Sequence, residues 1–225
     1  MLFNSLQYMI FLPVVLAVYY IIPDKLKHVW LLICSYFFYM CWNAVYALLI
    51  LFSTAATYLC ALLLERARKS AENKDRRLEK LSLALCLMLN LGILFHFKYF
   101  NFAVASINSA FARCGFAFSC PTFDIVLPVG ISFYTFQALG YTIDVYRGDI
   151  YAEKSFLRYA LFVSFFPQLV AGPIERSKNL LKQLAVPEKA DFNTMREGVL
   201  LILWGFFLKV VLSDRIAIFV DTVYG

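Results

Sequence analysis

Long apolar runs separated by short polar segments dominate this chain of 225 residues. The runs cover 6–22, 29–64, 81–111, 127–145, 156–174 and 195–223. A helix needs about 20 apolar residues to cross a bilayer, so the first run predicts one span. The second run is too long for one span, and Trp42 and Asn43 offer a turn between two. The pattern predicts an all-α, polytopic membrane bundle of about five or six spans.

The composition supports a membrane protein. Apolar residues make up 62% of the chain and charged residues 16%, whereas a soluble domain is under about half apolar and roughly a quarter charged. The net charge of +6 comes from short basic segments between apolar runs, which membrane orientation explains without nucleic acid. Residues 1–23 lack a basic start and a small-residue cleavage site, so they predict a retained helix rather than a signal peptide.

The basic segments also predict an orientation, because short positively charged loops stay cytoplasmic. The polar loop predicted at 65–80 has seven Lys or Arg residues against four acids, so we place it inside. Lys25 and Lys27 then also lie inside, and the N-terminus lies outside the cytoplasm. Counting forward places 112–124 outside and 146–154 inside. The chain is therefore expected to pass several times through the cytoplasmic membrane.

The stretch SFFPQLVAGPIER at 164–176 contains helix-breaking residues, and basic residues flank both of its ends. A simple span would put one of these basic flanks outside the cytoplasm, against the predicted orientation. Phe156 to Phe166 is about 16 Å of helix, and Pro167 is expected to break it there. We predict a re-entrant segment near 156–176, and such backbone must be buried in protein or line a wet cavity. The alternative is a kinked span whose Gln168 bonds a neighbouring helix.

A polar stripe precedes this stretch, with members spaced three, four and three residues apart. Its members are Tyr134, Gln137, Tyr141 and Asp144. The spacing places them on one helix face, opposite Ile131, Phe133, Ala138 and Val145. Such a stripe is expected to face the bundle interior or a cavity, and Asp144 can pair with Arg147. We interpret it as a wall of the cavity that the re-entrant turn lines; packing with an interfacial ion pair is the alternative.

Other polar residues are weaker candidates for a functional role. His96 has no carboxylate, serine or cysteine at helical spacing, so we predict a structural role, and His28 is expected in the first basic loop. Lys98 is expected to extend to the outer surface, while the role of Lys209 stays open. Cys114 and Cys120 would form a disulfide only in an oxidising compartment. The sequence shows no P-loop, GxSxG or HExxH motif, and no metal site is predicted.

Two long motifs resemble one enzyme family. LPVGISFYTFQALGYTIDVYRG at 127–148 and FVSFFPQLVAGPIERSKNLLKQL at 162–184 are similar to the membrane-bound O-acyltransferases, in the bacterial alginate O-acetyltransferase branch. The first 23 residues and LFHFKYFNF at 94–102 resemble it too. The resemblance implies transfer of an acyl group, acetyl in this branch, from a cytoplasmic donor such as acetyl-CoA to an extracytoplasmic polysaccharide, with no bound cofactor.

The same resemblance implies what lies outside the chain. The family's catalytic histidine follows a later Trp-rich segment, and neither His28 nor His96 matches it, so no catalytic residue is expected before Gly225. We expect 1–225 to be the N-terminal portion of one membrane domain, inactive alone, with lipid and an SGNH-hydrolase-like protein as partners. The predicted acyl-chamber residues are Tyr134, Gln137, Tyr141, Asp144, Arg147, Pro167, Gln168, Gly172, Pro173 and Arg176.

Three alternatives remain open from the sequence. The chain could belong to an enzyme of the same family that transfers D-alanyl groups to teichoic acid. It could be a transporter or channel, since these also use re-entrant turns, although its two halves show no repeat. It could also be a fragment that only binds a partner.

Overall fold

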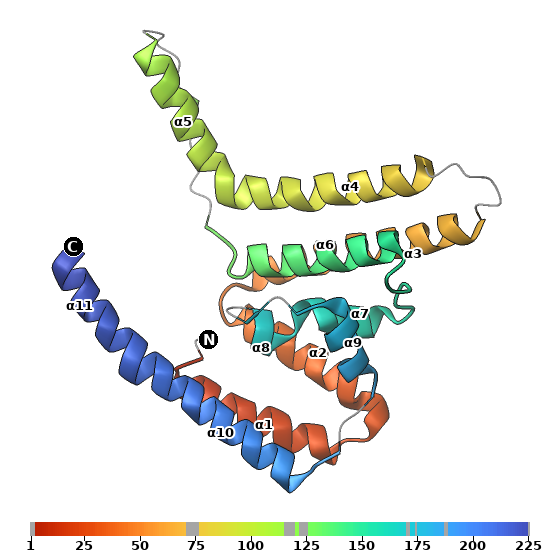
Figure 1. The fold of residues 1–225 in the computed structure, drawn as a ribbon, viewed down its shortest axis with the longest axis vertical. Coiled ribbons are helices and arrows are strands. Elements are labelled where there is room, and N and C mark those ends of the chain that lie inside the picture. The colour runs from red at the N-terminus through yellow and green to blue at the C-terminus, as the bar shows by residue number, and fades with distance from the viewer. Residues whose placement is uncertain are drawn as a thin grey trace. The chain divides into compact units, whose positions relative to one another are not determined.

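The computed structural model describes residues 3–70, 77–114, 120–121, 126–169, 172–173, 175–186 and 189–224. These residues form helices, turns and irregular connections without any strand, which confirms the all-α class (Figure 1). The first helices are α1 Leu6–Ile21, α2 Asp24–Met40, α3 Ala44–Ser70, α4 Arg77–Leu94, the π-helix η1 Phe95–Tyr99 and α5 Phe100–Arg113. They are followed by α6 Ile131–Arg147, α7 Phe156–Ser164, α8 Phe166–Leu169, α9 Ser177–Ala185, α10 Phe192–Phe206, the π-helix η2 Phe207–Ser213 and α11 Asp214–Tyr224.

The chain divides into two compact units. One unit contains 1–23 and 187–225, and the other contains 24–186. In the first unit, the Nζ atom of Lys209 lies 2.6 Å from the Oδ1 atom of Asp214. Lys209 is exposed, and this pair gives it a carboxylate partner five positions later in the chain.

The second unit is built around α6 and α7. Helix α3 packs against α2, α4, α6 and α7, and α9 packs against α6 and α7. From Tyr159 to Ser164, helix α7 is buried on every side, because each of these residues is at most 2% exposed. A helix without an exposed face must find all its polar partners inside the protein.

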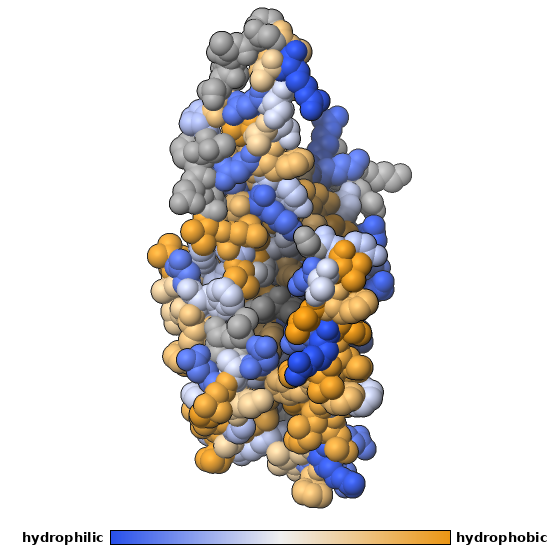
Figure 2. All heavy atoms as spheres, turned by 90° about the vertical axis from the view of Figure 1, so that its left-hand side faces the viewer, coloured by the Kyte–Doolittle hydropathy of each residue, from blue (hydrophilic) through white to orange (hydrophobic). Residues whose placement is uncertain are grey.

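Among the described residues, two helices are long and apolar enough to cross a membrane, Ala44–Arg68 and Arg77–Arg113. Leu6–Ile21 and Phe156–Leu169 are apolar but shorter. Large hydrophobic side chains are exposed along these helices, and Figure 2 shows apolar residues over much of one face. Soluble monomers rarely expose such large apolar areas, so the surface is consistent with a membrane protein.

Several boundaries differ from the predictions. The break between α2 and α3 covers residues 41–43, which include the predicted turn at Trp42 and Asn43, but α2 already begins at Asp24. The predicted loop at 65–80 is wrong at both ends, because α3 continues to Ser70 and α4 begins at Arg77. Arg, Lys, Glu and Ala are good helix formers, so these polar residues extend the apolar helices beyond the ends of the hydrophobic runs.

The run at 81–111 forms one continuous helix that bends where η1 inserts a π-helical turn (Figure 1). At this bend, Lys98 donates through its Nζ atom to the Oγ atom of Ser132, 3.1 Å away. The lysine is exposed, and this hydrogen bond ties the bend to the start of α6. His96 is exposed and contacts only the aromatic rings of Phe97 and Phe100 among the contacts described for it.

Two further predictions concern His28 and the loop cysteines. His28 lies inside α2 rather than in a loop, and its Nε2 atom hydrogen-bonds the carbonyl of Leu184 in α9. Cys114 and Cys120 are both free thiols. His28 therefore holds α9 against α2, a structural role that its place in the sequence did not indicate.

Candidate functional site

The segment from α7 to α8 runs antiparallel to α6. Three contacts in order along α6 join Gly130 to Leu169, Gln137 to Phe162 and Tyr141 to Tyr159. The segment thus starts beside the C-terminal half of α6 and reaches the first turn of that helix.

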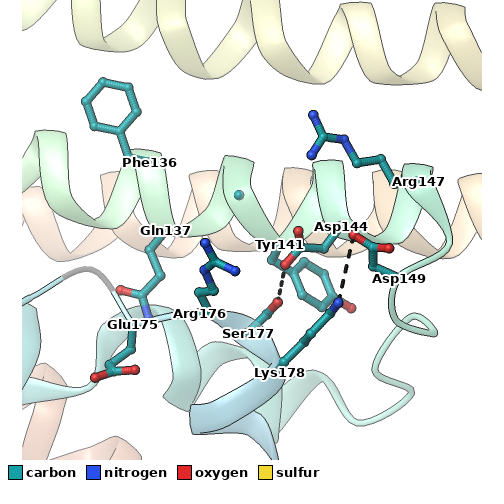
Figure 3. A pocket seen from close by; sticks show the side chains of 11 residues that line it. Phe136, Gln137, Tyr141, Asp144, Arg147, Asp149, Glu175, Arg176, Ser177 and Lys178 are labelled. Atoms are coloured by element: carbon teal, nitrogen blue, oxygen red, sulfur yellow. Dashed lines mark hydrogen bonds and ion pairs between the residues drawn. The ribbon is translucent and has the colours of Figure 1, made fainter.

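The chain then returns to the end of α6 from which it came. The Oγ atom of Ser177, the first residue of α9, donates to the Oδ2 atom of Asp144 at 2.6 Å (Figure 3). Asp144 lies one turn from the C-terminal end of α6. The described parts of 156–177 therefore run along α6 and back, with Pro167, Gln168 and Pro173 near the far end.

The helix breaks slightly earlier than predicted. Helix α7 ends at Ser164, Phe165 is extended with ψ 111°, and Pro167 is the second residue of α8. Proline lacks an N–H and its ring clashes with the carbonyl four residues back, but the first turn of a new helix tolerates it. Pro167 therefore prevents α7 from continuing beyond Phe166, while itself fitting the start of α8.

The turn closes around Gln168, which is 7% exposed. Its Nε2 atom donates to the carbonyl of Pro173 at 2.9 Å, and its own carbonyl accepts from the N–H of Gly172 at 3.0 Å. The Nε2 atom of Gln137 lies 3.5 Å from the Oε1 atom of Gln168. The two glutamines are thus neighbours at the point where α6 meets the turn.

A first pocket of about 280 Å³ lies between α6 and the start of α9 (Figure 3). Its lining includes five of the predicted residues, Gln137, Tyr141, Asp144, Arg147 and Arg176. It also includes six residues that sequence reasoning missed, Phe136, Gly140, Asp149, Glu175, Ser177 and Lys178. Most of the missed residues are polar and lie in loops or at helix starts. They are not spaced at a helical repeat, so no sequence pattern indicates that they meet beside α6.

A second pocket of about 280 Å³ lies at the turn itself. It contains the other predicted turn residues, Pro167, Gln168, Gly172 and Pro173, together with Phe165, Glu175, Leu180 and Gln183. Glu175 lines both pockets. The predicted single chamber is therefore two adjoining pockets in the structure. Tyr134 lines neither of them, and its buried hydroxyl has no hydrogen-bond partner among the described residues.

The predicted pair of Asp144 with Arg147 is not formed. Asp144 accepts from Ser177 instead, and Figure 3 shows Arg147 pointing away from it. Lys178 lies 3.9 Å from Asp149. Within the described part of the chain, Arg147 and Arg176 have no carboxylate partner. The pocket therefore has two arginines whose charges are not neutralised by a contact.

The burial of the polar stripe is confirmed for Tyr134, Gln137 and Tyr141, while Asp144 is half-buried. The predicted placement on the opposite face is wrong for Ile131, Ala138 and Val145, because at about 100° per residue they lie beside Tyr134 on the same side of α6. All three are buried, whereas Phe133 is exposed. The exposed residues of α6 gather on another side of the helix, at Phe133, Phe136, Gly140 and Arg147. Tyr141 also accepts from the backbone N–H of Glu153 at 2.7 Å, which fixes the loop after α6.

Ser35 of α2 is a further residue that sequence reasoning missed. Its Oγ atom accepts from the N–H of Phe166 at 3.3 Å and donates to the carbonyl of Leu31 at 2.8 Å. A single serine in an apolar helix is an ordinary feature, so only the fold reveals this contact. In the parts of the chain that the structure describes, no group of three or more His, Cys, Asp or Glu residues could hold a metal ion.

Comparison with known proteins finds relatives along 98% of this chain. It is 36% identical over 222 residues to a Pseudomonas aeruginosa protein named "Probable alginate O-acetylase AlgI", and 34% identical to the protein of that name from Azotobacter vinelandii. It is 30% identical over 253 residues to the "Peptidoglycan O-acetyltransferase" of Helicobacter pylori. The chain spans 41%, 43% and 46% of these relatives' lengths.

Other comparisons add less. A "Teichoic acid D-alanyltransferase" of Streptococcus thermophilus is 31% identical over 38% of this chain. No family profile and no solved structure matches. The relatives along the whole chain confirm the resemblance that the motifs around α6 and α8 predicted.

Proposed function

We propose that this chain, a relative of bacterial O-acetylases in the membrane-bound O-acyltransferase family, is the N-terminal portion of a multi-pass membrane enzyme. The enzyme transfers an acetyl group from a cytoplasmic donor to an extracytoplasmic polysaccharide. The observation that carries this proposal is the similarity along 98% of the chain to proteins named for alginate and peptidoglycan O-acetylation.

The proposed orientation places the end of α3, the start of α4 and the end of α6 in the cytoplasm. Figure 1 shows these three ends on the same side of the second unit. The close approach of the Arg68 guanidinium to Gly148 supports this, because it brings the ends of α3 and α6 together. The return of Ser177 to Asp144 supports a re-entrant segment that enters and leaves on that cytoplasmic side.

In this arrangement the first pocket opens near the cytoplasmic ends of the helices and would receive the charged part of the donor. Arg147 and Arg176 would bind its phosphates, since guanidinium groups form strong charge-assisted hydrogen bonds with phosphate oxygens. The carboxylates of Asp144 and Asp149 would repel phosphate less than free carboxylates do. Ser177 donates a hydrogen bond to Asp144, and Lys178 lies beside Asp149. The second pocket, beside Gln168, would hold the acyl arm of the donor.

Acyl transfer itself needs a base that these residues do not provide. The acceptor hydroxyl must lose its proton as its oxygen attacks the thioester carbonyl and the thiolate leaves. His28 bonds the carbonyl of Leu184, and His96 contacts only aromatic rings among its described contacts. The described residues therefore support donor binding and positioning, and we place the base elsewhere in the full-length enzyme.

The test of the proposed donor site is steady-state acetyl transfer to polysaccharide by the full-length enzyme with its natural partners. Arg176→Ala is expected to raise the KM for the donor roughly tenfold to a hundredfold, because one charge-assisted contact is lost. Lys182→Ala is the matched control, since Lys182 is an exposed cation of α9 that lines neither pocket. Equal KM values for the two variants would remove Arg176 from donor binding.

A second prediction concerns the polar turn. Gln168→Ala is expected to lower kcat by about tenfold or more, because the carbonyl of Pro173 loses its buried donor and the turn loses its fixed geometry. The change in donor KM should be smaller than that of Arg176→Ala. An unchanged kcat would show that Gln168 takes no part in shaping the acyl site.

One alternative rests on a specific observation, the partial match to a teichoic acid D-alanyltransferase. Parallel assays with acetyl and D-alanyl donors, and with polysaccharide and teichoic acid acceptors, separate the two functions.

We further propose that an SGNH-hydrolase-like protein completes the transfer, which co-purification with the full-length enzyme would test. We expect residues 1–225 alone to give no acetyl transfer, and measurable turnover would contradict this.

A further inference from the structure

The break between α7 and α8 separates the two halves of one helical hydrogen bond. In an unbroken α-helix, the N–H of Phe166 would donate to the carbonyl of Phe162. Here Phe165 is extended, so these two groups no longer meet. Both residues are almost fully buried, at 2% and 0% exposure, and an unpaired backbone group in that environment is strongly unfavourable.

Each separated group is bonded instead by a side chain from a different helix. The N–H of Phe166 donates to the Oγ atom of Ser35 in α2 at 3.3 Å. The carbonyl of Phe162 accepts from the Nε2 atom of Gln137 in α6 at 2.8 Å. Ser35 is 0% exposed and Gln137 is 5% exposed, so water cannot replace either side chain easily.

Ser35 is itself held in place for this contact. Its hydroxyl donates to the carbonyl of Leu31 within α2 at 2.8 Å, which turns an oxygen lone pair toward Phe166. The rings of Phe38 and Phe166, 5.8 Å apart, pack beside it. Ser109 in α5 makes the same kind of internal bond, to Ala105 at 2.8 Å, but is exposed and has no second contact described. The bond from Phe166 therefore distinguishes Ser35 from an ordinary helix serine.

We propose that Ser35 and Gln137 are positioning residues that together hold the helix break at Phe165 and so place Gln168 at the second pocket, beside Gln137. Without them, the N–H of Phe166 and the carbonyl of Phe162 are best satisfied by each other. That pairing requires Phe165 to become helical, which moves Pro167 and Gln168 away from Pro173. The proposal deepens the proposed function, on which its catalytic consequence rests, while its structural part stands on the hydrogen bonds alone.

The experiment compares Ser35→Ala, Gln137→Met and the matched control Ser109→Ala in the full-length protein in membranes. Hydrogen–deuterium exchange of a peptide covering 163–169 measures the turn directly. Acetyl transfer, separated into kcat and KM for the donor, measures its effect on the reaction. Methionine nearly matches glutamine in size without its amide, so Gln137→Met removes the donor while it keeps the packing.

Ser35→Ala and Gln137→Met are each expected to speed exchange in this peptide by about tenfold, the effect of losing one buried partner. Both should lower kcat by about tenfold or more because the turn is displaced, and Ser109→Ala should change neither quantity. In the double variant the two orphaned groups can pair with each other. Its loss of thermal stability should therefore be smaller than the sum of the single losses.

Two results would overturn the proposal. Unchanged exchange in both single variants would show that these side chains do not hold the break. Faster exchange with unchanged kcat would show that they hold it without positioning anything for the reaction. If the unsubstituted protein transferred no acetyl group, the proposed function would fail, and the exchange data would still decide the structural part.

Discussion

Gly130→Ala is expected to lower the stability of the protein by roughly 2–5 kcal/mol, because two separate costs add. Gly130 has φ +74°, a left-handed conformation that residues with a side chain adopt at a cost. An added Cβ would also lie 2.4 Å from the carbonyl oxygen of Leu169. That oxygen belongs to the backbone of α8, so no rotamer change relieves the clash.

The measurement is thermal unfolding of the full-length protein in detergent or nanodiscs. Gly92→Ala is the matched control, since Gly92 lies inside helix α4 with no atom within 4 Å of its Cβ position. It should leave the stability unchanged or raise it by up to about 1 kcal/mol. A Gly130 variant as stable as the Gly92 variant would mean that α6 and α8 do not approach as closely as described.

Gly172→Ala is expected to reduce acetyl transfer about a hundredfold with a smaller loss of stability, about 1–3 kcal/mol. A Cβ on Gly172 would lie 2.6 Å from the Cα atom of Gln168 and 3.0 Å from its carbonyl oxygen. The turn must therefore open, and the opening moves Gln168 relative to Gln137. Because Gly172 is partly exposed at the edge of the second pocket, the rest of the fold should tolerate this movement.

The activity measurement is kcat for acetyl transfer, checked against the amount of folded enzyme. Gly198→Ala in α10 is the control, because no atom lies within 4 Å of its Cβ position. Both variants change a glycine to alanine, so a common effect on expression is removed by the comparison. Near-normal activity of Gly172→Ala would indicate that the tight turn is not needed for the reaction.

Residue patterns predicted much of the fold. Run length and a polar interruption placed the turn after α2, because a helix cannot bury 36 apolar residues in one bilayer crossing. Helical spacing predicted that Tyr134, Gln137 and Tyr141 share a buried face, since side-chain direction follows from the helix repeat alone. The helix break near Pro167 followed from the missing N–H of proline. All of these depend on residues close together in the chain.

The pairing of distant residues was decided only by the tertiary structure. Spacing allowed Asp144 to pair with Arg147, but Ser177 reaches it across the site, and a residue 33 positions away leaves no local signal. Likewise, nothing around Ser35 indicates that it bonds Phe166, 131 positions later. Sequence alone thus determined which segments are apolar, most of what is helical, and where one helix must break. The packing of α2 and α6 against that break decided which polar groups satisfy it, because hydrogen bonds depend on distances in space that the sequence does not contain.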